Sequence, residues 1–120
     1  MANGLNKVQL IGNLGRDPEV KVFDGNRKRV NFTLATSETY KNKEGIKTTT
    51  TEWHNVVLWS PLAEIAERFL QKGSQVYIEG KIITRSYEDA NGQTKYTTEI
   101  NGRQLILLGR VSNGEGNSDI

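Results

Sequence analysis

The side chains best suited to chemistry in this 120-residue chain are aromatic and basic, and they share the faces of predicted strands. Trp53 and Trp59 lie six positions apart. Because side chains alternate along a strand, this even spacing aims both rings in one direction. Arg85 and Tyr87 share a face of another predicted strand, and Tyr40 lies where a strand enters a long loop.

A surface of this kind is what single-stranded nucleic acid requires. Each base offers a flat face whose stacking on an aromatic ring is worth roughly 1–3 kcal/mol, and each phosphate attracts a cation. The face of Trp53 is flanked by Lys41, Lys43 and Lys47. The alternative is that the tryptophans are packed in the core of a small barrel, but the basic loop, with Arg85 and Tyr87, favours binding.

The net charge is a modest +2. All 16 basic residues but only 12 of the 14 acidic ones lie in residues 1–110, an excess of four positive charges. This excess fits a basic groove better than a wholly basic surface. Arg27-Lys28-Arg29 is the only basic triplet; a solvated strand start is the simpler interpretation, and a phosphate contact is the alternative.

Residues that could support catalysis are scarce. The chain has no cysteine and one histidine, which excludes thiolate chemistry, disulfides, cysteine-bearing zinc sites and multi-histidine metal sites. No motif places a serine or aspartate to complete a relay with His54, so a structural or subunit-contact histidine is expected. There is no phosphate-cradling glycine loop and no dinucleotide fingerprint. We predict a non-enzymatic protein that needs no cofactor and no metal.

Neither a membrane span nor a secretion signal is evident. The longest apolar runs, 56–59 and 105–108, are four residues long, far below the length of a membrane span. The first residues lack the charged and apolar regions of a signal peptide. A cytoplasmic protein is expected.

Five strands are predicted from alternating or β-branched apolar residues separated by glycine-containing turns. They cover approximately residues 5–14, 27–36, 46–59, 75–87 and 94–108. A short extended piece at 20–23 precedes the second strand, and Asn91-Gly92 is a strong hairpin signal between the last two.

One helix is predicted between the third and fourth strands. Ser60 suits the N-cap, Pro61 the first helical position, and Gly73 the stop. A buried stripe is expected because apolar residues recur at helical spacing. Its members are Leu62, Ile65, Ala66, Phe69 and Leu70.

This order of elements is that of an all-β OB-fold, a five-stranded, partly open barrel with one helix between strands 3 and 4. Another small barrel or a half-open sandwich would not require a helix there. Residues 1–110 form the predicted domain. Residues 111–120 are polar and glycine-rich, which predicts a flexible tail.

Longer motifs occur at residues 4–19, 34–38, 51–58, 70–80 and 96–99. In their residues and their order they resemble the motifs of the bacterial single-stranded DNA-binding protein (SSB) family. The resemblance extends over essentially all of residues 4–110 and implies a homotetramer that coats single-stranded DNA with little sequence preference in replication, recombination and repair.

The resemblance also implies site residues. The DNA-stacking aromatics of the family fall on Tyr40, Trp53, Trp59 and Tyr87. The phosphate-contacting positions fall on Lys7, Lys21, Lys43, Lys72 and Arg85. This chain departs from the family at Asn55 and Pro61, where a basic residue is usual, and these departures bear on the strength and salt dependence of binding.

The family's subunit contacts imply interface roles for Asn6, His54, Gln75 and Tyr77. Family members usually end in an acidic, aromatic-terminated tip that recruits replication and repair proteins. Residues 111–120 contain no such tip, so we expect these partners only for a form with a longer acidic tail.

Two alternatives to DNA coating follow from the residues. An OB-fold module that binds protein or RNA would prefer those partners to oligo-dT. A metal-dependent nuclease would need carboxylates gathered at one end of the barrel, although no paired-carboxylate motif is present. The candidates are Glu52, Glu79, Glu88, Asp89 and Glu99.

Overall fold

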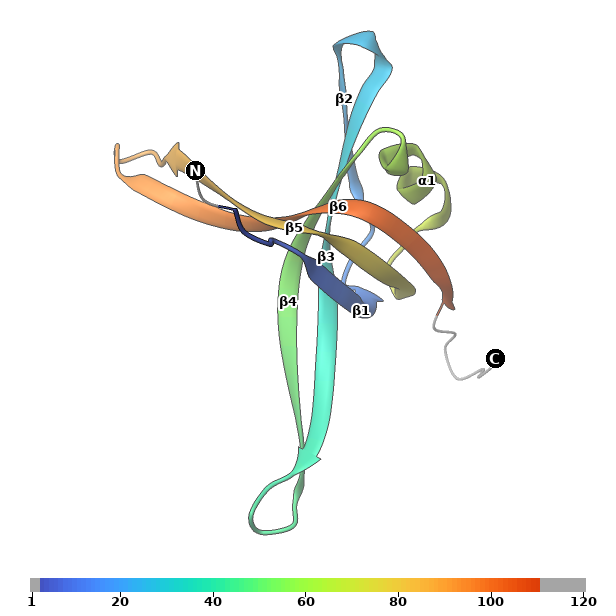
Figure 1. Cartoon of the computed structure of the whole chain (residues 1–120), viewed down its shortest axis with the longest axis vertical. Helices are drawn as coiled ribbons and strands as arrows, with labels where there is room; N and C mark the ends of the chain where they lie inside the picture. The colour runs from blue at the N-terminus through green and yellow to red at the C-terminus, as the bar shows by residue number, and fades with distance from the viewer. Residues whose placement is uncertain (1–2, 111–120) are drawn as a thin grey trace.

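The computed structural model describes residues 3–110, which form six strands and one α-helix (Figure 1). The helix, α1, spans Leu62–Phe69, and a short 3₁₀ turn spans Asp24–Asn26. The strands are β1 (Val8–Leu14), β2 (Glu19–Phe23), β3 (Arg27–Lys41), β4 (Lys47–Trp59), β5 (Ser74–Glu88) and β6 (Thr94–Arg110). The predicted tail, 111–120, lies outside the described residues.

The strands form one sheet that closes into a barrel. Their order is β1-β5-β6-β4-β3-β2, and β1 also pairs with β3. Two short seams complete the barrel: Asn13 and Leu14 pair with β3, and Val56 and Val57 pair in parallel with β6. The predicted five-stranded barrel is therefore present, formed by β1, β3, β4, β5 and β6. The short strand β2 pairs only with β3, and α1 lies between the third and fourth barrel strands.

Three antiparallel hairpins extend from the barrel as arms (Figure 1). They are β2–β3, β3–β4 and β5–β6. The β3–β4 ladder is continuous from Arg29 opposite Trp59 to Lys41 opposite Lys47. The strand predicted at residues 27–36 corresponds to β3 and is longer than predicted. Polar cross-strand pairs such as Thr39–Thr49 continue the ladder toward the tip without burying apolar surface.

The core consists of the alternate residues of the long strands. Leu34, Leu58 and Ile78 are fully buried. Burying an aliphatic side chain of this size contributes roughly 1.5–3 kcal/mol. The remaining core residues of the strands are Leu14, Val30, Phe32, Val56, Val76 and Ile100. The period-2 pattern of the sequence therefore predicted the inner face correctly.

Two glycines permit the close strand crossings of the barrel. A Cβ on Gly12 would lie 2.2 Å from the carbonyl oxygen of Ala35, and one on Gly80 would lie 2.1 Å from that of Asn101. Real side chains do not approach backbone this closely. Gly80 also adjoins an irregularity in the β5–β6 register, at the point where that hairpin leaves the barrel.

The helix differs from its prediction at both ends. It begins at Leu62, with Pro61 in the cap position after a cis Ser60–Pro61 bond, and no side chain caps it. The predicted cap was wrong because the Ser60 hydroxyl is engaged elsewhere: it accepts from the Lys28 amide and donates to Glu64. The helix ends at Phe69, before the predicted stop at Gly73.

The buried face of α1 is also narrower than predicted. Ala63, Ala66 and Leu70 are buried, whereas Ile65 and Phe69 are 40% and 57% exposed. This eight-residue helix on the end of a small barrel buries its two alanines and packs Leu62 partly against the core, and Leu70, which follows the helix, is also buried. In residues 3–110 no helix is long and apolar enough to cross a membrane.

Candidate nucleic-acid interface

Trp53 and Trp59 share the outer face of the β3–β4 hairpin. Trp53 lies opposite Ala35 and Trp59 opposite Arg29, six positions apart on the neighbouring strand. Their neighbours Val56 and Leu58 point into the core instead. The even spacing in the sequence therefore predicted this shared face.

Trp53 is the more open of the two rings, with 60% of the side chain exposed. Its inner edge lies against the turn after β1, where a Cβ on Gly15 would be only 2.4 Å from Trp53 Cζ3. The turn is fixed to β3 because the Gly15 amide donates to the Thr33 carbonyl at 3.0 Å. Trp53 is thus an exposed ring with a rigid backbone support.

Trp59, in contrast, is half-buried and already has ring partners. Its centroid lies 5.5 Å from that of Phe23 with the planes tilted by 45°. The Arg27 guanidinium carbon lies 4.2 Å from the Trp59 centroid. Phe23 and Arg27 were not among the predicted site residues. The sequence holds no signal that β2 folds back beside the end of β4, because strand register is not encoded locally.

A cleft of about 210 Å³ opens on the same outer face. It lies between the β3–β4 hairpin and the base of the β5–β6 hairpin, and its lining includes Thr33, Asn55, Thr97 and Glu99. A second hollow adjoins it on β2 and β3. The two hollows share Glu19 and Asn31 and together form a groove. Its lining includes Asn55 and Val57, which lie between Trp53 and Trp59 along β4, but neither ring.

The β5–β6 hairpin carries Arg85 and Tyr87 on one face, as predicted. Tyr87 is 52% exposed and lies opposite Lys95. The Arg85 Nε donates to Glu99 at 2.9 Å, so this guanidinium is held in an ion pair in the free protein.

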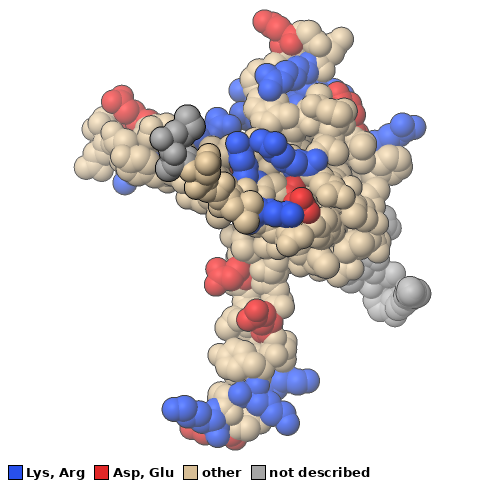
Figure 2. All heavy atoms as spheres, viewed as in Figure 1, with Lys and Arg blue, Asp and Glu red and all other residues tan. Residues whose placement is uncertain are grey.

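The β3–β4 tip carries the remaining predicted aromatic and the basic loop. Tyr40 is 51% exposed and lies opposite Thr48, on the hairpin face that points away from Trp53. Basic side chains gather at this tip (Figure 2). They include Lys41, Lys43 and Lys47. Because Tyr40 and Trp53 lie on opposite faces, a nucleic-acid strand that contacts both rings must pass around the β3–β4 arm.

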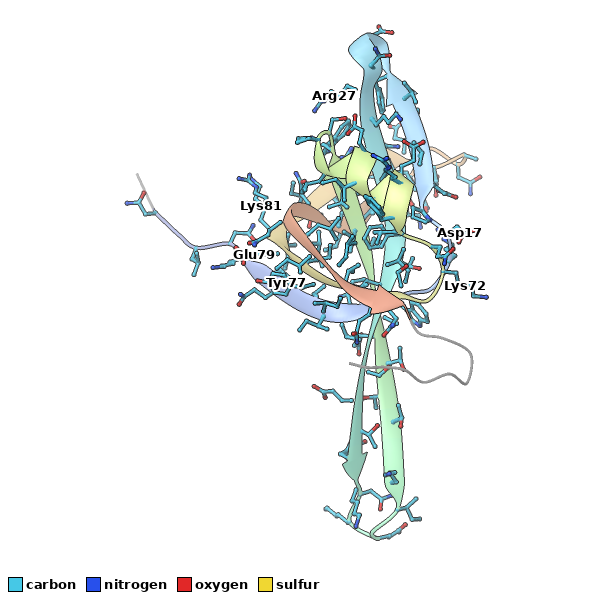
Figure 3. All side chains as sticks on the ribbon, turned by 90° about the vertical axis from the view of Figure 1, so that its right-hand side faces the viewer. Asp17, Arg27, Lys72, Tyr77, Glu79 and Lys81 are labelled. Atoms are coloured by element: carbon cyan, nitrogen blue, oxygen red, sulfur yellow. The ribbon has the colours of Figure 1, made fainter. Side chains whose placement is uncertain are left out.

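The predicted phosphate contacts do not form one patch. Lys21 lies beside the Trp59 cluster, opposite Arg29. Lys7 forms an ion pair with Glu79 at 3.7 Å, whereas the backbone amide of Lys72 donates to Asp17. Figure 3 shows Glu79 and Lys72 on opposite sides of the barrel.

Of the four predicted interface residues, Gln75 and Tyr77 lie on β5, Asn6 lies just before β1 and His54 lies on β4. The Asn6 side chain continues the β1–β5 ladder by bonding both the amide and the carbonyl of Ile82. His54 Nε2 lies 2.9 Å from Thr36 Oγ1 on the face opposite Trp53. Gln75 lies on the outer face of β5 with Tyr77.

Tyr77 is the centre of a polar cluster on that face. Its hydroxyl donates to Glu79 at 2.6 Å and accepts from Gln9. The hydrogen bond from Tyr77 lowers the pKa of Glu79; partial burial opposes this effect and the nearby Lys7 adds to it. Two exposed apolar residues, Ile11 and Ile106, flank Tyr77 across the three strands.

The carboxylates proposed for a nuclease do not assemble. Among residues 3–110 there is no group of three histidine, cysteine, aspartate or glutamate side chains that could hold a metal ion. Glu79 and Glu99 are each in an ion pair with a basic side chain instead.

A five-stranded barrel with aromatic and basic side chains along an outer groove defines the class of OB-fold proteins that bind single-stranded nucleic acid. The chain belongs to the Single-strand binding protein family, which matches residues 5–111. It is 50% identical over 120 residues to single-stranded DNA-binding protein 1 of Chlorobaculum tepidum, covering 99% of this chain and 74% of that protein. A solved Plasmodium falciparum SSB complex with ssDNA is similar at a TM-score of 0.82 and 32% identity, covering 90% of this chain and 98% of that one.

Proposed function

We propose that this protein coats single-stranded DNA, with little preference for sequence, in replication, recombination and repair. The observation that carries the proposal is the groove on the outer face of the barrel, which is lined by Asn55 and Val57 on the stretch of β4 between Trp53 and Trp59. Membership of the single-strand binding family and the likeness to a solved SSB complex with ssDNA support it.

Stacking supplies the sequence-independent part of binding, because every base has a flat face. Trp53 offers the most exposed ring beside the groove, and Tyr87 offers another on the β5–β6 arm. Tyr40 lies on the reverse of the β3–β4 arm, where a strand leaving the groove would reach it. The rings on separate arms would space the bases along a wrapped path.

Phosphate neutralisation supplies the other part. The lysines at the β3–β4 tip and Lys21 on β2 are exposed on either side of the tryptophans. Arg85 must exchange its partner Glu99 for a phosphate, so this contact forms only on binding. Each phosphate contact releases counterions, and the affinity should therefore fall as salt rises.

We further propose that four copies assemble, with the β1–β5–β6 face as one contact. Ile11, Tyr77 and Ile106 form a row across this face, in which the two isoleucines are 57% and 43% exposed. A tetramer would let one strand occupy several grooves, which raises the effective concentration of each further contact. The protein would act by binding alone, as a cytoplasmic protein without catalysis.

Titration with oligo-dT while following tryptophan emission tests the proposal, since both tryptophans lie on the groove's face of the β3–β4 hairpin, on either side of Asn55 and Val57. We expect quenching that saturates and a lower affinity at higher salt. Unchanged emission together with no gel shift would refute it. Oligo-rU and a structured RNA serve as comparators, and tighter binding of either would favour the RNA-binding alternative. Magnesium added to the dT complex tests the nuclease alternative, and sedimentation of the free protein and its complex gives the number of copies.

A further inference from the structure

The basic triplet 27–29 is divided between the two faces of β3. Arg27 and Arg29 lie on the outer face with Trp59, because Arg29 is directly opposite Trp59 in the ladder. Lys28 points to the other face, where its ammonium pairs with Glu67 of α1. The triplet is therefore not a uniformly solvated strand start: its two arginines share the face of Trp59, and Arg29 lines the hollow that continues the groove.

The outer-face cations lie over aromatic rings. Arg27 lies 4.2 Å from the Trp59 centroid, and Arg29 lies 5.8 Å from Trp59 and 5.5 Å from Phe23. Lys21, opposite Arg29, lies 5.3 Å from the Phe23 centroid. Such cation–π contacts hold flexible side chains in place while leaving their N–H groups available. Figure 3 shows Arg27 on this upper arm.

These three cations lack acidic partners. None of the ion pairs between residues of the described range includes Lys21, Arg27 or Arg29. Arg29 Nε is buried and has no hydrogen-bond partner. Lys21 and Arg29 also line the hollow of about 430 Å³ that continues the groove; Glu19 lines it too but pairs with neither. A guanidinium that lines a hollow and has no acidic partner suits a phosphate, which it can bind through two bonds.

We propose that Lys21, Arg27 and Arg29, held on the rings of Phe23 and Trp59, form a phosphate subsite that extends the groove along the β2–β3 arm. This inference rests on the proposed DNA-binding function. Two residues along a strand span about 6.8 Å, so the arginines are spaced to meet separate phosphates of one strand. In this arrangement Trp59 is a positioning residue that orients Arg27, while Trp53 provides the open stacking face.

The test compares the salt dependence of oligo-dT binding for the wild type and the variant Arg27→Gln/Arg29→Gln. Each phosphate contact on a single strand contributes about 0.7 to the slope of log affinity against log salt, so the loss of two contacts should lower the slope by about 1.4. A fourfold rise in salt would then weaken the variant's binding about sevenfold less than the wild type's.

Lys28→Gln is the matched control, since it removes one charge from the same triplet on the opposite face. Its slope should equal that of the wild type. Arg27→Lys/Arg29→Lys retains the charges and should keep most of the slope, which separates phosphate binding from a structural role. If the double glutamine variant does not fold, the single variants Arg27→Gln and Arg29→Gln should each lose about 0.7.

The outcomes distinguish a failure of the proposed DNA-binding function from a failure of the phosphate subsite alone. A wild type that does not bind oligo-dT refutes the DNA-binding function itself. A wild type that binds, with folded arginine variants of unchanged slope, refutes only the subsite. A loss of slope in Lys28→Gln equal to that of Arg27→Gln would also overturn it, because the effect would then be one of net charge.

Discussion

Replacing Gly15 by alanine should weaken DNA binding through Trp53 without unfolding the barrel. The new Cβ would lie 2.4 Å from Trp53 Cζ3, whereas ordinary contact begins at 3.4 Å, so the ring must retreat by about 1 Å. Trp53 is 60% exposed and can tilt outward. Gly15 does not have a left-handed backbone angle, so we expect the stability to change by no more than about 1 kcal/mol.

The effect on affinity follows from the same geometry. A stacked base contributes roughly 1–3 kcal/mol, and a shift of this size forfeits about a quarter to a half of a van der Waals contact. The expected loss is therefore about 0.25–1.5 kcal/mol, a Kd about 1.5- to 12-fold weaker. Removing the ring entirely in Trp53→Ala should cost the whole stack, roughly 5- to 150-fold.

Fluorescence anisotropy of a labelled oligo-dT measures these affinities independently of tryptophan emission. Gly4→Ala is the matched control, because a Cβ at Gly4 meets no atom within 4 Å, and it should bind as the wild type does. The decisive measurement is Gly15→Ala in the Trp53→Ala background, where it should have no further effect. An equal loss in both backgrounds would refute the reasoning, since the glycine would then act independently of the ring.

Three further predictions concern stability and charge. Trp59→Ala should lower the free energy of unfolding by about 1–2.5 kcal/mol, because it removes the ring contact with Phe23 and the cation–π contact with Arg27; urea denaturation checks this, and a change below about 0.5 kcal/mol would contradict it. Glu99→Gln should raise the affinity for oligo-dT at unchanged salt slope, because Arg85 no longer has to give up an ion pair to contact a phosphate, whereas an affinity equal to that of the wild type would place Arg85 away from the phosphates. Because the Tyr77 hydrogen bond holds the pKa of Glu79 below its ordinary 4.5, the ionised carboxylate stabilises the fold above that pH, and this contribution is lost as the pH falls through the folded pKa. Tyr77→Phe should therefore flatten the loss of stability between about pH 5 and pH 3 in urea titrations, and an acid limb identical to that of the wild type would argue against the Tyr77 contact.

Alternation along strands could be predicted from the sequence, and with it the composition of both faces. The sequence placed Val56 and Leu58 on one face and Trp53 and Trp59 on the other. Side chains alternate with a period of two residues in any strand, so this assignment does not depend on the neighbouring strands. The order of elements favoured the OB-fold barrel over another small barrel or a half-open sandwich, and the resemblance to the SSB family strengthened that prediction.

Contacts between strands could not be predicted in the same way. Nothing in residues 19–29 indicates that Phe23 and Arg27 come to lie on Trp59, because register depends on how distant strands meet. The helix shows a related limit. Its spacing predicted that Ile65 and Phe69 would be buried, but the barrel end covers Ala63, Ala66, Leu70 and part of Leu62 and leaves Ile65 and Phe69 exposed.

The parallel seam between β4 and β6 bears on how the barrel opens. Only Val56–Ile100 and Val57–Asn101 join these strands, whereas β3–β4 and β5–β6 are long ladders. The seam between β1 and β3 is equally short, so local unfolding should begin at these two seams, with the β3–β4 and β5–β6 hairpins separating as intact units. The cleft is lined by Asn55 of β4 and Thr97 of β6, so a strand of DNA bound there would contact both strands and hold the β4–β6 seam closed. At a ligand concentration of 100 Kd such binding stabilises the closed barrel by about 2.7 kcal/mol, and amide exchange at the seam would slow accordingly.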